Sequence, residues 1–189
     1  MRIGLFGGSF NPIHNGHLKV ARHAMSELNL DKVFFVPSCL TPLKKSRELL
    51  PASTRAALIR AAIQDQPGFA LSLCEIRRKG WSFTVDTLEY FRKKFSKNTT
   101  LFFLCGQDTP KNFNRWKEAK RLTTLARFVV VTRPGVSNRR LPDGMIFLPM
   151  EPAEVSSTLV RRRLEKKQSL KGLVPKSVEA RLLSIPNKD

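Results

Sequence analysis

Two histidines beside a glycine-rich turn are the residues of this chain best suited to chemistry. They close the eleven-residue run Gly7-Gly8-Ser9-Phe10-Asn11-Pro12-Ile13-His14-Asn15-Gly16-His17. Glycine lets a backbone approach a phosphate closely, and a helix after such a turn points its N–H groups at an anion. Glycine at position 16 is expected to remove a side chain that would obstruct the phosphate. The run predicts a phosphate-binding site with His14 and His17 as hydrogen-bond donors.

A metal site is the competing use of a histidine pair. His14 and His17 have no third ligand at a suitable spacing. The remaining histidine, His23, is expected on the surface of the same helix. We therefore predict no resident metal ion.

A second group of polar residues lies near the C-terminus, in the run Val155-Ser156-Ser157-Thr158-Leu159-Val160-Arg161. Ser156 or Ser157 is a natural helix N-cap, and hydroxyls beside the N–H groups of a helix start can cradle an anion. Arg161 follows within the first turns, where it can reach a phosphate. Taken by itself, the run also fits an ordinary capped helix with a surface arginine.

Apolar strands that alternate with amphipathic helices must position these residues. Strands are expected at 2–6, 33–37, 69–73, 101–105, 128–131 and 145–148. Helices are expected at 16–28, from Ser53 or Thr54 onward, and at 84–95, 110–125, 156–167 and 175–183. Continuously apolar strands indicate a parallel sheet covered on both faces. The pattern predicts one doubly wound α/β domain over residues 1–189, with ligands bound outside the carboxyl ends of the strands.

Composition restricts the partners without naming a ligand. The chain has 34 lysines and arginines against 15 acidic residues, for a net charge of +19. Such a charge favours polyanions or phosphorylated small molecules. The basic residues are dispersed, however, and form no long tail or aromatic-interleaved strand, so nucleic acid is not an expected partner. No stretch approaches the roughly 20 apolar residues that cross a bilayer, so no membrane association is expected either.

Cysteine usage bears on the cellular compartment. Cys39, Cys74 and Cys105 are odd in number and widely spaced, which fits reduced thiols. The N-terminus has too short an apolar run for a signal peptide. The expected location is the cytoplasm.

The two polar runs resemble known signatures. The first resembles that of the HIGH-type nucleotidyltransferases, in which H-x-G-H follows G-[TS]-F-[DN]-P, and the second resembles their I-S-S-T-x-x-R element. The resemblance implies a Rossmann-like nucleotidyltransferase fold with C-terminal helices, and in-line attack of one substrate's phosphate on the α-phosphorus of ATP. It makes His14, His17 and Arg161 catalytic, with Mg²⁺ carried on the ATP phosphates. The residues it assigns to ATP binding here are Gly7, Gly8, Ser9, Phe10, Ser156, Ser157 and Thr158.

Other stretches resemble the bacterial nicotinate-nucleotide adenylyltransferases over nearly the whole chain. Gly106-Gln107-Asp108-Thr109 resembles that family's G-[AQ]-D-[ST] element. This match adds Gly106 and Asp108 to the ATP site, with the acid on a ribose. The family resemblance implies adenylyl transfer to nicotinate mononucleotide, which yields nicotinate adenine dinucleotide and pyrophosphate in NAD biosynthesis.

The same resemblance assigns the mononucleotide site. Residues 80–88 resemble the family's P-S-Y-T-x-x-T-L segment, which places Thr84 on the pyridine carboxylate. Trp116 matches a tryptophan that stacks on the nicotinate ring, and Arg133 begins an R-P-G turn near bound nucleotide. Lys44 ends a segment that resembles P-N-x-x-P-P-H-K, in which this chain has serine and leucine in place of the asparagine and histidine. Lys44 can still bind a phosphate, whereas the altered segment bears on substrate discrimination.

Alternative substrates and one alternative class remain. Nicotinamide mononucleotide differs only in the amide, and preference for the acid follows here from the family resemblance alone. Phosphopantetheine adenylyltransferases share both end motifs but lack the G-Q-D-T, Trp116 and R-P-G set. A basic nucleic-acid-binding protein would explain the charge but would leave His14, His17 and Arg161 without a role.

Overall fold

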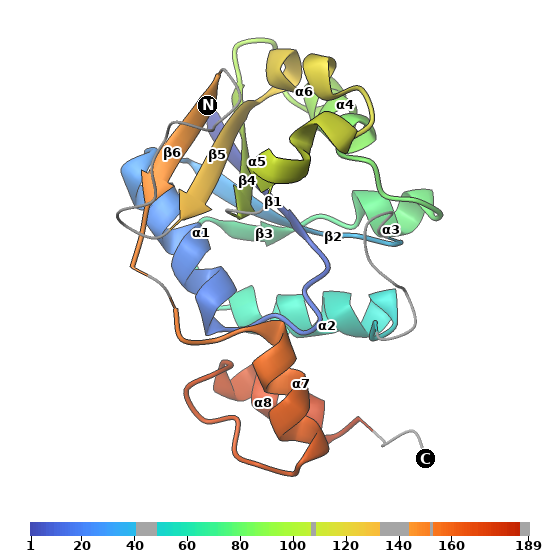
Figure 1. Ribbon diagram of the computed structural model, residues 1–189, viewed down its shortest axis with the longest axis vertical. Helices are drawn as coiled ribbons and strands as arrows, with labels where there is room; N and C mark the ends of the chain where they lie inside the picture. The colour runs from blue at the N-terminus through green and yellow to red at the C-terminus, as the bar shows by residue number, and fades with distance from the viewer. Residues whose placement is uncertain (41–48, 107–108, 133–143, 152, 186–189) are drawn as a thin grey trace.

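Six parallel strands form the centre of the described part of the molecule (Figure 1). The computed structural model describes residues 1–40, 49–106, 109–132, 144–151 and 153–185. The strands are β1 (Arg2–Gly8), β2 (Lys32–Pro37), β3 (Phe69–Leu71), β4 (Thr100–Gly106), β5 (Arg127–Thr132) and β6 (Met145–Pro149). They lie in the order β3-β2-β1-β4-β5-β6, and each neighbouring pair is parallel. The predicted parallel sheet is therefore confirmed.

Helices cover both faces of this sheet. The first helices are α1 (Asn15–Glu27), α2 (Ala52–Ile63), α3 (Cys74–Arg78) and α4 (Thr84–Lys94). They are followed by α5 (Thr109–Asn112), the 3₁₀ turn η2 (Phe113–Arg115), α6 (Ala119–Leu125), α7 (Ser157–Glu165) and α8 (Lys176–Leu183). Figure 1 shows α1 and α2 on one side of the sheet, α4 and α6 on the other, and α7 and α8 beyond α2. The arrangement confirms the doubly wound α/β fold.

The continuously apolar strands follow from burial on both faces. Successive strand residues point to opposite faces, so Phe6 and Phe35 join the core beneath α1 and α2, whereas Leu5 and Phe34 join the core beneath α4. Each fully buried side chain of this size contributes about 1.5–3 kcal/mol of transfer free energy. Two cores, one on each face, hold the sheet rigid beneath its carboxyl edge.

Local structure differs from the sequence prediction most clearly in three places. Helix α2 has Pro51 as its N-cap, with no side-chain cap hydrogen bond, and begins at Ala52, so the prediction of Ser53 or Thr54 as the cap was wrong. Helix α3 was not predicted, because five residues are too few to show a helical period. The helix expected at 110–125 is divided into α5, η2 and α6, and the backbone turns at Glu118, which has a φ of 53°.

The C-terminal helices pack beside α2. The hydroxyl of Ser177 at the start of α8 donates a 2.8 Å hydrogen bond to the carbonyl of Ala61 in α2. Val178 and Leu182 are buried in the core that also contains α1 and α2. None of the helices within the described ranges is both long and apolar enough to cross a membrane.

Candidate active site

The glycine-rich turn leaves the sheet at the carboxyl end of β1, beside β4. The strand order reverses between these two strands, and such switch points are where open α/β sheets bind ligands. A Cβ on Gly7 would lie 2.9 Å from the Phe103 ring, so glycine is required for close packing there. Phe10 has a φ of 44°, an uncommon value for a bulky residue, and its buried ring lies 5.0 Å from that of His17. The Phe10 side chain thus belongs to the core, and only its backbone can face a nucleotide.

The two histidines form one unit at the start of α1. Their rings stack with centroids 3.7 Å apart. The backbone N–H of His14, the N-cap residue, donates a 3.2 Å hydrogen bond to Nδ1 of His17. Because Nδ1 accepts this bond, the neutral His17 ring carries its proton on Nε2 and can donate from that atom.

His14 is buried in a neutral state. Its side chain is 7% exposed, and burial lowers the pKa of His14 from 6.5 to about 4. Within the described parts of the chain, its buried Nδ1 atom has no hydrogen-bond partner. Native proteins rarely leave a buried polar atom unsatisfied. The unpaired Nδ1 therefore fits an imidazole that takes part in a binding site better than one that only stabilises a turn.

Gly16 has a packing role that the sequence prediction did not include. A Cβ at this position would lie 3.0 Å from Nδ1 of His14 and 3.0 Å from Cγ1 of Val155. The glycine therefore makes room for the His14 ring and for the segment before α7. It is a packing requirement between two parts of the chain that are distant in the sequence.

Arg161 joins the two polar runs. Its Nη1 donates a 2.8 Å hydrogen bond to the carbonyl of Asn11, and its Nη2 lies 3.4 Å from Oγ1 of Thr158. The hydroxyl of Ser157 donates to the carbonyl of Pro12 at 2.9 Å. Ser156 is the N-cap of α7, and its Oγ accepts from the backbone N–H of Leu159. The start of α7 is thereby fixed against the turn that leads to His14.

A cavity of about 270 Å³ opens beside this turn. Gly7, Gly8 and Ser9 line one side, and Gly106 lines it at the end of β4. Thr84 and Trp116, predicted for the mononucleotide, line it as well. The structure therefore brings predicted ATP and mononucleotide residues to one cavity. The Trp116 ring is held edge-on against Phe103, with ring centroids 6.0 Å apart.

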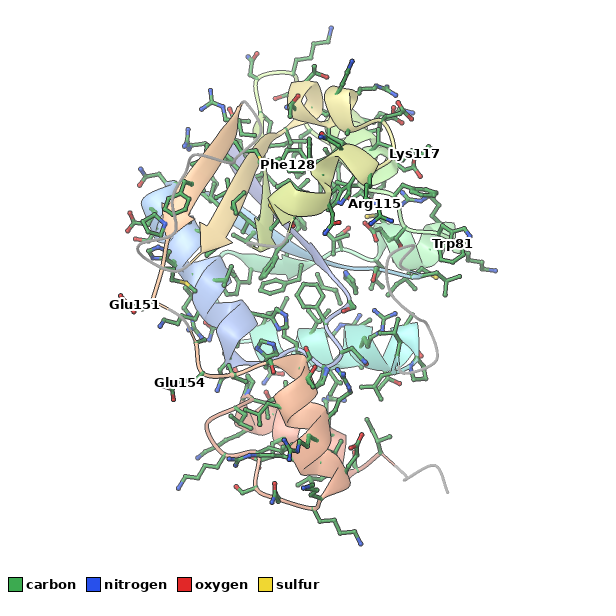
Figure 2. All side chains as sticks on the ribbon, viewed as in Figure 1. Trp81, Arg115, Lys117, Phe128, Glu151 and Glu154 are labelled. Carbon is green, nitrogen blue, oxygen red and sulfur yellow. The ribbon has the colours of Figure 1, made fainter. Side chains whose placement is uncertain are left out.

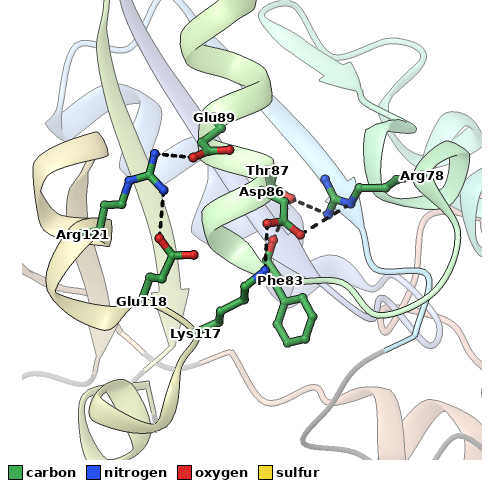
Figure 3. Close-up of polar contacts among 8 residues, drawn as sticks. All are labelled: Arg78, Phe83, Asp86, Thr87, Glu89, Lys117, Glu118 and Arg121. Carbon is green, nitrogen blue, oxygen red and sulfur yellow. Dashed lines mark hydrogen bonds and ion pairs between the residues drawn. The ribbon is translucent and has the colours of Figure 1, made fainter.

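Charged side chains complete the cavity wall. Arg115 and Lys117 line it, and Figure 2 shows both between α5 and α6 on the same side of the molecule as Trp81. The Lys117 ammonium lies 3.6 Å from a carboxylate oxygen of Asp86 and 4.9 Å from the centre of the Phe83 ring (Figure 3). Asp86 also approaches Arg78 at 3.9 Å. This side of the cavity presents cations next to the start of α4.

Glu75 in α3 is a buried acid on the same wall. Its carboxylate accepts a 2.6 Å hydrogen bond from the hydroxyl of Thr87. Burial raises the pKa of Glu75, and the hydrogen bond from Thr87 acts in the opposite direction. Sequence reasoning missed this residue because it missed α3.

The remaining predicted residues fall into two groups. Lys44, Asp108 and Arg133 lie outside the described residues. The catalytic and phosphate-binding candidates around α1 and α7 lie next to the cavity rather than in its lining; they are His14, His17, Ser156, Ser157, Thr158 and Arg161.

Arg55 is a further buried polar residue that the sequence prediction missed. It is 1% exposed, and its guanidinium donates three hydrogen bonds to backbone carbonyls. Nε donates to Leu50 at 2.9 Å, Nη1 to Ser9 at 2.8 Å and Nη2 to Cys39 at 3.3 Å. A signal was present, because Leu58 and Ile59 follow Arg55 at helical spacing and place it on the buried face.

Comparison with known proteins identifies the family. Residues 5–163 match the cytidylyltransferase-like family model. The probable nicotinate-nucleotide adenylyltransferase of Thermus thermophilus is 41% identical over 179 residues, which cover 95% of each chain. The nicotinate-nucleotide adenylyltransferase of Bacillus subtilis is 34% identical over 178 residues, which cover 94% of this chain and 93% of that protein. The chain belongs to the nicotinate-nucleotide adenylyltransferase family.

The fold of a solved structure agrees with membership of the nicotinate-nucleotide adenylyltransferase family. Plasmodium falciparum nicotinic acid mononucleotide adenylyltransferase complexed with NaAD matches with a TM-score of 0.77 over 96% of this chain and 94% of that one. At 19% identity the likeness shows the fold alone, and it confirms the predicted Rossmann-like nucleotidyltransferase fold. As a member of this family, the chain is a nucleotidyltransferase.

Proposed function

We propose that the chain transfers the adenylyl group of ATP to nicotinate mononucleotide, which forms nicotinate adenine dinucleotide and releases pyrophosphate in NAD biosynthesis. The observation that carries the proposal is the junction of the two polar runs beside one cavity. Arg161 and Ser157 bind the carbonyls of Asn11 and Pro12, next to a cavity lined by Ser9 on one side and Trp116 on the other. The names of the relatives support the same reaction.

The reaction needs positioning and charge neutralisation rather than a nucleophilic side chain. A phosphate oxygen of the mononucleotide forms a bond to the α-phosphorus of ATP as the bond from that phosphorus to the β-phosphate oxygen breaks. The electron pair of the broken bond leaves with pyrophosphate. The attacking phosphate is already ionised, so no general base is required, and catalysis rests on orientation and on donors aimed at the phosphoryl oxygens.

The histidines and Arg161 are the proposed donors. Nε2 of His17 carries its proton because Nδ1 accepts from His14, so the ring can donate to a phosphate oxygen without being charged. A guanidinium has five N–H donors, and Arg161 retains donors for the leaving pyrophosphate beside its two bonds to Asn11 and Thr158. The N–H groups at the start of α7 add a favourable dipole for that anion.

Mg²⁺ is proposed to arrive on the phosphates of ATP. The donor set around α1 and α7 consists of imidazole, hydroxyl and guanidinium groups, which do not fit the carboxylate-rich oxygen shell of a resident Mg²⁺. Within the ranges that the structure describes, no group of three His, Cys, Asp or Glu side chains could hold a metal ion. The phosphates of ATP would supply the oxygen ligands, and the metal would neutralise part of their charge.

The proposal is tested by pyrophosphate release from ATP and Mg²⁺. Nicotinate mononucleotide, nicotinamide mononucleotide and phosphopantetheine are compared as second substrates at equal concentration. We expect fastest turnover with the nicotinate form. Faster turnover with the amide form would keep the chemistry and change the substrate. Turnover only with phosphopantetheine would contradict the proposed reaction, and no turnover with any of them would reject adenylyl transfer.

A further inference from the structure

Arg55 ties together three backbone segments, two of which reach the cavity wall. Its side chain is buried, and Nη1 donates to the carbonyl of Ser9 at 2.8 Å. Nη2 donates to the carbonyl of Cys39 at 3.3 Å, and Nε donates to that of Leu50 at 2.9 Å. One rigid planar group therefore fixes the distances between a turn, the end of a strand and the start of a helix.

Two of these segments form the cavity wall. Ser9 lines the cavity, and so does Ser38, the neighbour of Cys39. The backbone at Cys39 is held from a second side as well. Its N–H donates a 2.8 Å hydrogen bond to the hydroxyl of Ser82, which also lines the cavity. Arg55 thus joins the wall assigned to ATP to the wall that continues toward the mononucleotide.

The third segment links Arg55 to the catalytic residues. The backbone N–H of Leu50 donates a 2.8 Å hydrogen bond to Oδ1 of Asn11. The carbonyl of the same Asn11 accepts the 2.8 Å hydrogen bond from Arg161. A shift of Leu50 or Ser9 would therefore move the residue on which Arg161 is anchored.

We propose that Arg55 is a positioning residue for adenylyl transfer, which holds the turn at Ser9 and Asn11 at a fixed distance from the segment at Ser38 and Cys39. This inference rests on the proposed function and adds a residue that touches neither substrate. Its removal leaves three carbonyls without their donor. The two walls then relax independently, and displacements of about 1 Å can cost roughly 100-fold in rate.

Arg92 is a matched control. Its guanidinium also bridges backbone carbonyls, with 2.8 Å hydrogen bonds to Leu125 and Thr99. These residues precede β5 and β4, at the amino ends of the strands and so at the opposite edge of the sheet from the cavity. Loss of Arg92 removes the same kind of tie without touching the site.

The test compares the variants R55K and R92K, with R55M as a more severe change. Lysine keeps the charge but cannot donate in three directions from one plane. Folded protein is quantified by circular dichroism, and kcat and the KM of each substrate are measured at temperatures below the onset of unfolding. The rise in Tm caused by ATP with Mg²⁺ is measured in parallel as a readout that needs no turnover.

The expected result is a kcat for R55K that is roughly 10- to 100-fold below wild type per folded molecule, while R92K stays within about twofold. R55K should also lose most of the ATP-dependent rise in Tm. If R55M does not fold, the inference is judged from the kcat and the ATP-dependent Tm rise of R55K alone. Equal kcat and equal ATP-dependent Tm rises in R55K and R92K would overturn the inference. A wild type that shows the ATP-dependent rise but no turnover would reject the proposed reaction, and the Tm comparison would still test Arg55.

Discussion

Nη1 of Arg161 donates a 2.8 Å hydrogen bond to the backbone carbonyl of Asn11, across 150 positions of the sequence. This contact fixes the last of the proposed catalytic residues on the same turn that leads to His14. Arg55 also binds this turn, through its hydrogen bond to the carbonyl of Ser9. The proposed phosphate site is therefore assembled on one short loop between β1 and α1, with guanidinium groups on two sides.

Replacement of Arg161 by methionine should lower kcat far more than stability. The change removes a cation proposed to bind the leaving pyrophosphate, and loss of one such preorganised donor costs about 100- to 1,000-fold in kcat. Arg162 is the control, because it is the next residue of α7 and is exposed. Steady-state pyrophosphate release from R161M and R162M gives the comparison. A fall of equal size in both variants would contradict a specific role for Arg161.

Replacement of His17 by asparagine should separate structure from catalysis. The Oδ1 atom of asparagine can accept the bond from the His14 N–H, as Nδ1 does in the native chain. It cannot replace the Nε2 donor in the same position. We expect kcat to fall by roughly 100-fold or more, with Tm close to wild type by thermal unfolding.

His23 gives the matched control for that experiment. It lies later in the same helix and its Nε2 is 2.8 Å from the carbonyl of Pro149, outside the proposed site. H23N should keep its wild-type kcat. Wild-type turnover in H17N would refute the catalytic role assigned to His17.

The fold was predictable because strands buried on both faces have continuously apolar sequences. Residues 33–37 and 101–105 are apolar throughout, and only strands covered on two sides need such runs. The order of the strands depends on helix packing, which no local pattern reveals. Helix α3 was missed because its five residues make little more than one helical turn, too short for an apolar repeat to show, and Glu75 was missed with it.

The candidate site was predictable where residues adjacent in sequence act together. His14, His17 and the start of α7 fall into short runs whose spacing carries their chemistry. Arg55 was not predicted, because an arginine within a helix is usually solvent-exposed and its three carbonyl partners come from separate segments. The packing role of Gly16 against Val155 depends on a tertiary contact of the same kind.

Protonation of His14 should make stability depend on pH. Burial lowers the pKa of His14 from 6.5 to about 4 in the folded state, so the unfolded chain binds more protons between these values. The contribution of neutral His14 is fully present above pH 6.5 and is lost as the pH falls toward 4. At about 1.4 kcal/mol per pKa unit the full effect is roughly 3 kcal/mol, of which about 2 kcal/mol is lost by pH 5.

Denaturant unfolding at pH 7.5 and at pH 5 measures this effect. The variant H14N supplies the reference, because asparagine is a favoured N-cap and does not titrate. Groups distant from position 14 titrate equally in both proteins and cancel, so the difference reports on His14 and the ring of His17 stacked on it. Wild type should therefore lose about 2 kcal/mol more than H14N between the two pH values. Equal losses would mean that His14 is not buried as a neutral ring.

Lys117 is the residue that should affect the choice between acid and amide. It lines the cavity beside Phe83 and Thr84, with its ammonium 3.6 Å from Asp86. Replacement by methionine removes this cation. A partly exposed pair of the Lys117 ammonium and the nicotinate carboxylate would be worth about 1 kcal/mol. The ratio of kcat/KM for nicotinate mononucleotide to kcat/KM for nicotinamide mononucleotide should therefore fall about fivefold. Lys120, exposed on α6 and absent from the cavity lining, is the control, and K120M should leave the ratio unchanged. A ratio in K117M that equals the wild-type value would show that the Lys117 charge does not reach the pyridine substituent.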